Sequence, residues 1–252
     1  MKWFDFMKGF VIRDGVLLAY KGKKSRVVIP DTVTAFGMCA FYCNNKLVEV
    51  VIPEGVTEIQ DEAFSYCRKL ETVHIPAGVK VIGESAFKSC NNLRKIALPD
   101  IEKIHYAAFY KCENLEEVIL PDSEILVASL AFADCPKLAD NEGFIILKNF
   151  LFDYIGETAH ITIPDGVRVI GSEAIAWHDC FETVVCPDSV ELVLPNAFCG
   201  CHNMISVTIP NKMAQIREEA FLNCGRKTRI CAPEGSEAQR YVEENSIKFI
   251  AI

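Results

Sequence analysis

The chain has 252 residues, half of them apolar, and a formal net charge of −8. This composition supplies enough apolar side chains for a sizeable core and excludes wholesale disorder. The acidic excess argues against a nucleic-acid partner, because proteins that bind phosphate backbones carry a basic stripe. The longest basic run, residues 21–24, is too short to form one.

The N-terminus does not resemble a signal peptide, because Asp5 interrupts what would be its apolar stretch. No segment approaches the roughly 20 consecutive apolar residues that a membrane span needs. We therefore expect a chain without a membrane span that is not exported.

The first element expected is a β-hairpin over residues 9–22. Its two apolar segments are joined by Asp14-Gly15, a dipeptide that favours the tight turn between antiparallel strands. We interpret this hairpin as an N-terminal cap.

From residue 30 onward, three columns of residues recur with a period of 23. The prolines are Pro30, Pro53, Pro76, Pro99, Pro121, Pro164, Pro187, Pro210 and Pro233. The aromatic column is Phe41, Phe64, Phe87, Phe109, Phe132, Phe198 and Phe221, with Ile175 in the remaining slot. Six residues after each comes Leu47, Leu70, Leu93, Leu115, Leu138, Phe181, Met204 or Lys227. Such a period predicts a solenoid over residues 10–233, whose coils must stack because none can bury its apolar face alone.

Each position of a coil has a physical role. Val73 and Ile75 alternate with outward residues, as in a half-buried strand. The following proline ends that strand because it cannot donate to a β-ladder, and Gly78 permits the next turn. Residues 56–59 predict a second short strand, and Ala63-Phe64 predicts a tight helical or 3₁₀ corner with the phenylalanine inside the coil.

The chain resembles the BspA-type (treponemal) leucine-rich repeat family in the motif Val51-Ile52-Pro53-Glu54-Gly55-Val56-Thr57-Glu58-Ile59, followed by Ala63-Phe64-Ser65-Tyr66-Cys67. The motif repeats along nearly the whole sequence. We therefore predict a right-handed, β-rich leucine-rich-repeat solenoid of 23-residue repeats with short 3₁₀ or helical corners. The resemblance implies a surface or secreted adhesion-type protein of bacteria or some protists. The motif contains no catalytic residue, so none is carried to this chain.

One proline interval of 43 residues contains a second copy of the N-terminal hairpin. Residues 143–167 resemble residues 9–33 at a constant offset of 134, which pairs Tyr20 with Tyr154. We expect this copy to turn near Lys148-Asn149 and to lie beside the fifth coil. The sequence leaves open whether it bends the solenoid or splits it into two.

After Pro233 the period ends and a helix–strand cap is expected. Ser236 and Gln239 form the pattern of a capping box, Asn245 is a plausible stop, and residues 247–250 would add a last strand. Such a cap is needed because an open solenoid end exposes an unpaired strand edge.

We expect one continuous solenoid domain with three parts. Residues 1–142 contain the cap hairpin and the first run of repeats, residues 143–233 contain the second hairpin and the remaining repeats, and residues 234–252 form the C-terminal cap.

The twelve cysteines predict a packing ladder rather than disulfides. Six share one register, three residues after the column aromatic: Cys67, Cys90, Cys112, Cys135, Cys201 and Cys224. Stacked coils lie about 4.8 Å apart with parallel Cβ vectors, which is poor disulfide geometry, so each thiol should meet a backbone carbonyl in a packed corner. So many free thiols favour a reducing, cytoplasmic compartment, whereas the family resemblance favours the cell surface or secretion.

Two chemical alternatives centre on His178. In the stacked register His178, Cys201 and Cys224 fall in one column, where their imidazole and sulfur ligands could bind zinc. A column places ligands in a line rather than a tetrahedron, so we prefer corner packing and expect no metal or cofactor. A Cys-His-Asp nucleophile over residues 178–180 is weaker still, because sequence neighbours rarely supply triad geometry. We expect no enzymatic activity.

The candidate binding surface is the strand face of the solenoid. The outward residues two positions before each proline are Val28, Val51, His74, Ala97, Ile119, Thr162, Val185 and Thr208. This row is unusually apolar, which indicates either an interaction site or the ordinary preference of strands for β-branched residues. No aromatic column stands on it, which disfavours a dedicated sugar-binding platform.

Three functional hypotheses follow. The first is a non-catalytic interaction or adhesion-type module that binds a protein partner through the strand face, with a glycan as the other ligand class considered. The second is a purely structural repeat segment of a surface protein. The third is a metal-dependent enzyme or sensor at His178, Cys201 and Cys224.

Overall fold

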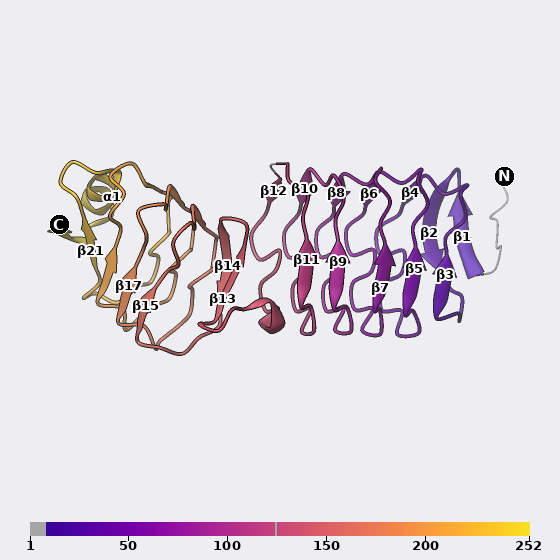
Figure 1. The fold of residues 1–252 in the computed structure, drawn as a ribbon, viewed down its shortest axis with the longest axis horizontal. Helices are drawn as coiled ribbons and strands as arrows, with labels where there is room; N and C mark the ends of the chain where they lie inside the picture. The colour runs from indigo at the N-terminus through magenta and orange to yellow at the C-terminus, as the bar shows by residue number, and fades with distance from the viewer. Residues whose placement is uncertain (1–8, 124) are drawn as a thin grey trace. The chain divides into compact units, whose positions relative to one another are not determined.

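A computed structural model describes residues 9–123 and 125–252. They divide into two compact units, the first ending at Leu138 and the second beginning at Ala139. In each unit the chain winds in coils that stack through parallel strands about one repeat apart in sequence (Figure 1). This confirms the predicted β-solenoid. The N-terminal hexapeptide that carried the signal-peptide argument lies outside the described residues.

The strands of the first unit form two faces. One face, which we call the strand face, contains β3 (Arg26–Val28), β5 (Glu49–Val51), β7 (Thr72–His74), β9 (Lys95–Ala97) and β11 (Glu117–Ile119). The second face contains β4 (Ala35–Phe36), β6 (Glu58–Ile59), β8 (Val81–Ile82), β10 (Lys103–Ile104) and β12 (Leu126–Val127). The middle residue of most strand-face strands is buried and its two neighbours are more exposed, as the alternation in the sequence predicts.

The prolines end the strands as expected. β5 stops at Val51, and the N–H of Ile52 still donates to the carbonyl of His74 in the next coil, at 3.1 Å. Pro53 then begins a turn in which its carbonyl accepts from the N–H of Val56 at 3.2 Å. Pro53 has no N–H to leave unpaired, so it fits where the ladder stops.

The corner around each column aromatic has an alternating hydrogen-bond pattern. Ser65 and Cys67 donate to residues three positions earlier, as a 3₁₀ turn requires. Glu62, Phe64 and Tyr66 instead donate to the following coil, at 2.7–2.8 Å. Glu62 and Tyr66 have positive φ, 53° and 59°, which turns their amides out of the coil. The corner is therefore a third ladder between coils.

The column aromatics stack inside the first unit. Neighbouring ring centroids in the series Phe41, Phe64, Phe87, Phe109 and Phe132 lie 4.9–5.2 Å apart, with interplanar angles of 15° or less. Each ring is essentially fully buried. The ring spacing matches the coil spacing, so the same repeat satisfies both the backbone ladders and the core.

Both predicted hairpins are present. β1 (Phe10–Arg13) and β2 (Val16–Tyr20) pair antiparallel, and β2 continues in parallel with β4. β13 (Phe144–Leu147) and β14 (Phe150–Tyr154) repeat this arrangement, and β14 continues in parallel with β16 (Val169–Ile170). The turns fall at residues 14–15 and 148–149, as predicted. Each hairpin thus forms the N-terminal edge of a sheet in its own unit.

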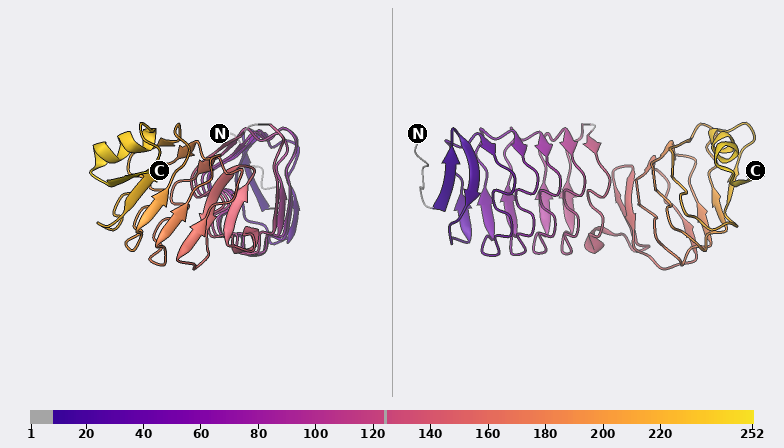
Figure 2. Two further views of the ribbon diagram at one scale, coloured as in Figure 1. Left: turned by 60° about the vertical axis from the view of Figure 1, so that its left-hand side comes forward. Right: turned by 180° about the vertical axis from the view of Figure 1, so that it is seen from behind.

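The second unit repeats the two-faced plan. Its strand face contains β15 (His160–Thr162), β17 (Thr183–Val185), β19 (Ser206–Thr208), β21 (Arg229–Ala232) and β22 (Lys248–Ala251). Its second face contains β13, β14 and β16 together with β18 (Leu192–Val193) and β20 (Gln215–Ile216). Figure 2 shows the strand face in orange, with the C-terminal helix in yellow.

The C-terminal cap is also confirmed. Helix α1 (Glu237–Asn245) begins after Ser236, whose Oγ accepts from the N–H of Gln239 at 3.2 Å. Tyr241 and Val242 face the core, and β22 then pairs with β21. Gln239 Oε1 reaches back to accept from the N–H of Gly235 at 2.7 Å, one residue before the N-cap, while the N–H of Ser236 donates to the carbonyl of Pro233. No helix in the described part of the chain is long and apolar enough to span a membrane.

Replacing Phe87 by alanine should destabilise the first unit. The ring contacts both neighbours in the stack, so its loss leaves a cavity that stacked coils cannot close. We expect the free energy of unfolding to fall by about 3–5 kcal/mol in chemical denaturation. The exposed Glu102 replaced by alanine is the control. A loss below about 1 kcal/mol for Phe87→Ala would contradict a core carried by this column.

Candidate functional site

The candidate row of the first unit lies on the outer side of the strand face. Val28, Val51 and His74 are in register on adjacent strands, as are Ala97 and Ile119. Val28 is 71% exposed and Ile119 is 45% exposed, whereas Val51 is half-buried. Their use in binding stays a prediction.

The row of the second unit is longer than predicted. Thr162, Val185 and Thr208 are in register, and Cys231 and Ile250 extend the row. Cys231 lies two residues before Pro233, so the proline rule could have found it. Ile250 has no following proline and gave no such signal.

Charged side chains flank the row in the first unit. Glu49 lies 3.3 Å from both Arg26 Nε and His74 Nε2, and Lys95 Nζ lies 2.8 Å from Glu117 Oε1. These pairs are exposed, so each contributes at most about 1 kcal/mol to stability. Their main effect is to orient side chains across neighbouring coils.

Glu116 joins two cations beside this surface. Its Oε1 accepts from Lys137 Nζ at 2.9 Å and from Arg94 Nη1 at 3.1 Å. The hydrogen bond from Lys137, with the positive charges of Lys137 and Arg94, holds the pKa of Glu116 below its ordinary value. The carboxylate therefore holds the guanidinium of Arg94 in place.

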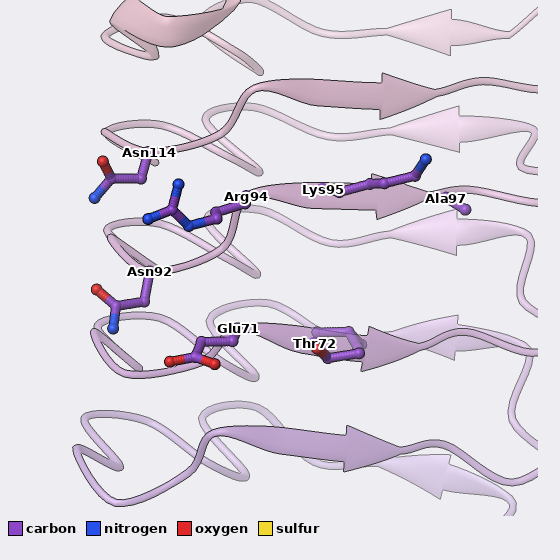
Figure 3. Close-up of a pocket in the computed structure, with 8 residues that line it drawn as sticks. Glu71, Thr72, Asn92, Arg94, Lys95, Ala97 and Asn114 are labelled. Atoms are coloured by element: carbon purple, nitrogen blue, oxygen red, sulfur yellow. The ribbon is translucent and has the colours of Figure 1, made fainter.

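A groove of about 550 Å³ opens on the strand face where these residues meet (Figure 3). Its lining residues are Glu71, Thr72, Val73, Asn92, Arg94, Lys95, Ala97 and Asn114. They come from successive coils, and Figure 3 shows Asn92 and Asn114 at the turns that precede the strands. The groove combines both signs of charge with amide side chains.

The groove coincides with a break in the strand ladder. Among the described residues β7 pairs only with β5, and β9 pairs only with β11. On the second face the same two coils stay joined, because β8 and β10 pair there, whereas the break on that face falls between β4 and β6. Facing strand edges carry backbone groups that can hydrogen-bond a ligand. No residue pattern signals this break, because Pro76 and Pro99 keep the ordinary interval of 23.

The cysteine ladder is present as predicted. The six thiols donate to the carbonyl of the column residue one coil earlier, at 2.9–3.2 Å: Cys67, Cys90, Cys112, Cys135, Cys201 and Cys224. All twelve cysteines are free. These six side chains are therefore part of the packing between coils.

Burial makes three of the ladder thiols poor nucleophiles and poor metal ligands. It raises the pKa of Cys67 and Cys224 to about 12 and that of Cys201 to about 11. The thiolate is the reactive and metal-binding form, so little of it exists near neutral pH.

The His178 region does not assemble the site considered in the sequence. The His178 ring packs 4.7 Å from the Phe181 ring, and the thiols of Cys201 and Cys224 are committed to backbone carbonyls. Within residues 9–123 and 125–252, no group of three or more histidine, cysteine or acidic side chains is arranged to hold a metal ion.

The repeats match a family model over residues 18–139 and 145–250, as six copies described as the BspA type leucine-rich repeat region. The chain belongs to this family. The matched segments span both units. The first ends shortly before the second hairpin, and the second begins within β13.

Solved structures resemble this leucine-rich repeat chain. A leucine-rich repeat protein from Bacteroides ovatus is 26% identical, with a TM-score of 0.56 over 86% of this chain and 58% of that protein. The chain thus spans less than two thirds of that relative. The leucine-rich repeat protein of T. pallidum is 23% identical over 94% of this chain and 91% of its own, with a TM-score of 0.47. A comparison with curated proteins finds no match.

The buried thiols predict how stability depends on pH. Thiols of the unfolded chain ionise near 9.0, whereas Cys67 keeps its proton to about 12, so its contribution is complete below pH 9 and is lost as pH rises. For each such thiol the free energy of unfolding should fall by up to about 1.4 kcal/mol per pH unit in that window. Chemical denaturation at several pH values should show that the free energy of unfolding falls less steeply with pH in the double variant Cys67→Ala/Cys90→Ala than in the wild type.

The matched control is Cys43→Ala, which removes a surface cysteine and should keep the wild-type slope. Identical slopes for the wild type and the Cys67→Ala/Cys90→Ala variant would contradict the burial of the ladder.

Proposed function

We propose that the chain is a non-catalytic binding module and that the strand face of its first unit contacts a protein partner. The observation that carries this proposal is the groove between β7 and β9, set beside an exposed row that includes Val28 and Ile119. Apolar and charged groups are both available there on one face of the first unit.

The rigidity of the backbone supports a binding role. Strand-face residues sit on coils held by ladders on the second face and at the corners. A partner would therefore meet side chains whose backbone is already ordered, which lowers the entropy lost on binding.

The chemistry of the groove also suits a protein ligand. Arg94 lies at its centre, oriented by Glu116, and arginine is enriched among residues that contribute most to protein interfaces.

The absence of a catalytic role is part of the same proposal. Its support is that the family motif has no catalytic position and that burial raises the pKa of Cys67 and Cys224. The other hypothesis, a purely structural repeat, predicts that surface substitutions have no effect on any interaction.

Substituting lysine for Val28 and Ile119 tests the proposal. Both side chains are exposed, so the double variant should fold while placing two charges on the apolar row. We expect the variant to recover a partner from extracts of the native host at least about tenfold less efficiently than the wild type, measured by crosslinking and quantitative mass spectrometry.

The control is Leu126→Lys, which places the same charge on the second face at a residue that is 70% exposed. It should capture the partner as the wild type does. Equal capture by all three proteins, or none by any of them, would reject the strand face as the interface and favour the structural repeat.

A further inference from the structure

A second polar surface lies on the corners of the first unit rather than on the strand face. We call it the tyrosine–lysine cluster, and its members are Tyr42, Tyr66, Arg68, Lys88, Tyr110 and Lys111. The rings of Tyr42 and Tyr66 lie 5.8 Å apart, edge to face. Lys88 Nζ lies 6.0 Å from the Tyr66 ring centre and 5.5 Å from that of Tyr110.

The repeat places these side chains together. Lys88 and Tyr110 each follow a column phenylalanine by one residue, and Tyr66 and Lys111 follow one by two. Tyr66 and Lys111 both have a φ of 59°. Because successive coils are in register, rings and ammonium groups alternate along the corner.

The cluster surrounds a hollow of about 400 Å³. Its lining residues are Tyr66, Arg68, Lys88, Ser89, Asn91, Tyr110, Lys111 and Glu113. Apart from the faces of the two tyrosine rings, the lining is polar. The hollow is therefore poorly suited to an aliphatic side chain.

The cations of the cluster differ in how far they are neutralised. Lys111 lies 3.8 Å from Asp134. Arg68 and Lys88 contact tyrosine rings, and in the described part of the chain neither forms an ion pair with a carboxylate. The lining of the hollow contains Arg68, Lys88 and Lys111 against the single carboxylate of Glu113, so it is locally cationic on a chain with a net charge of −8.

We propose that the tyrosine–lysine cluster binds an acidic oligosaccharide of the uronic-acid class. The C–H faces of sugar rings stack on aromatic rings, and their carboxylates would pair with Lys88 and Arg68 through charge-assisted hydrogen bonds. Tyr66 and Tyr110 belong to coils two apart, a separation of about 10 Å. Two sugar rings of one oligosaccharide can therefore stack while a carboxylate meets the lysine between them.

Two other anionic partners fit less well. An acidic peptide would require main-chain partners or an apolar pocket, and the lining supplies little of either. A single-stranded nucleic acid could stack its bases on the tyrosines, but the three cations of the cluster do not form the extended basic stripe that follows a phosphate backbone.

Calorimetric titration of the full chain with a short oligogalacturonate tests this site, with a neutral galactose oligosaccharide of the same length for comparison. We expect the acidic sugar to bind, to bind more weakly at high salt, and to be preferred over the neutral one. Lys88→Gln and Tyr66→Ala/Tyr110→Ala should each weaken binding about tenfold.

Lys103→Gln is the matched control, since it removes an exposed lysine from β10 on the second face, and it should bind as the wild type does. Lys88→Gln removes the charge and keeps a polar, unbranched side chain, so it remains informative should the double tyrosine variant fail to fold. The proposal is overturned by no binding of oligogalacturonate, by equal binding of the neutral sugar, or by wild-type affinity in Lys88→Gln. Tighter binding of polyglutamate or of oligothymidylate would also overturn it.

Discussion

The hydrogen bonds that join one coil to the next are the interaction on which the rest of the structure depends. The N–H of Phe64 donates to the carbonyl of Ala86, and the N–H of Phe87 donates to that of Ala108, at 2.7–2.8 Å. Each bond requires the adjoining coil at one fixed spacing. That spacing brings the aromatic rings into contact and sets each ladder thiol against the carbonyl of the coil before it.

Function follows from the same register. A residue at one position of the repeat becomes a neighbour of its equivalents in other coils, so a binding surface can be assembled from single residues widely separated in sequence. Lys88 reaches the Tyr66 and Tyr110 rings in this way, and Arg94 meets Glu116 likewise. The two proposed sites lie on either side of one turn, because Asn91 lines the corner hollow and Asn92 lines the strand-face groove.

Much of the fold could be predicted because the repeat presents the same evidence in every coil. The hairpins, the cysteine ladder and the C-terminal cap were each recognisable from a few residues with a defined local role. The alternating corner was not, because residues such as Glu62 and Tyr66 adopt positive φ without being glycine, and nothing in their side chains signals it. The break between β7 and β9 was also missed, since it depends on how two regular coils pack. The tyrosine–lysine cluster was not predictable from a single column, because its members come from different coils and from two different positions of the repeat.

Native-state hydrogen exchange across the corners tests the central claim most directly. If bonds between coils hold the structure, the amides of Glu62, Phe64 and Tyr66 should be as strongly protected as those of the strand ladders, because all of them open only when coils separate. The amides of Ser85, Phe87 and Ser89, which also donate to the following coil, should be protected to the same degree. Fast exchange of these amides at the rate of a surface loop, with the strand amides still protected, would contradict the account.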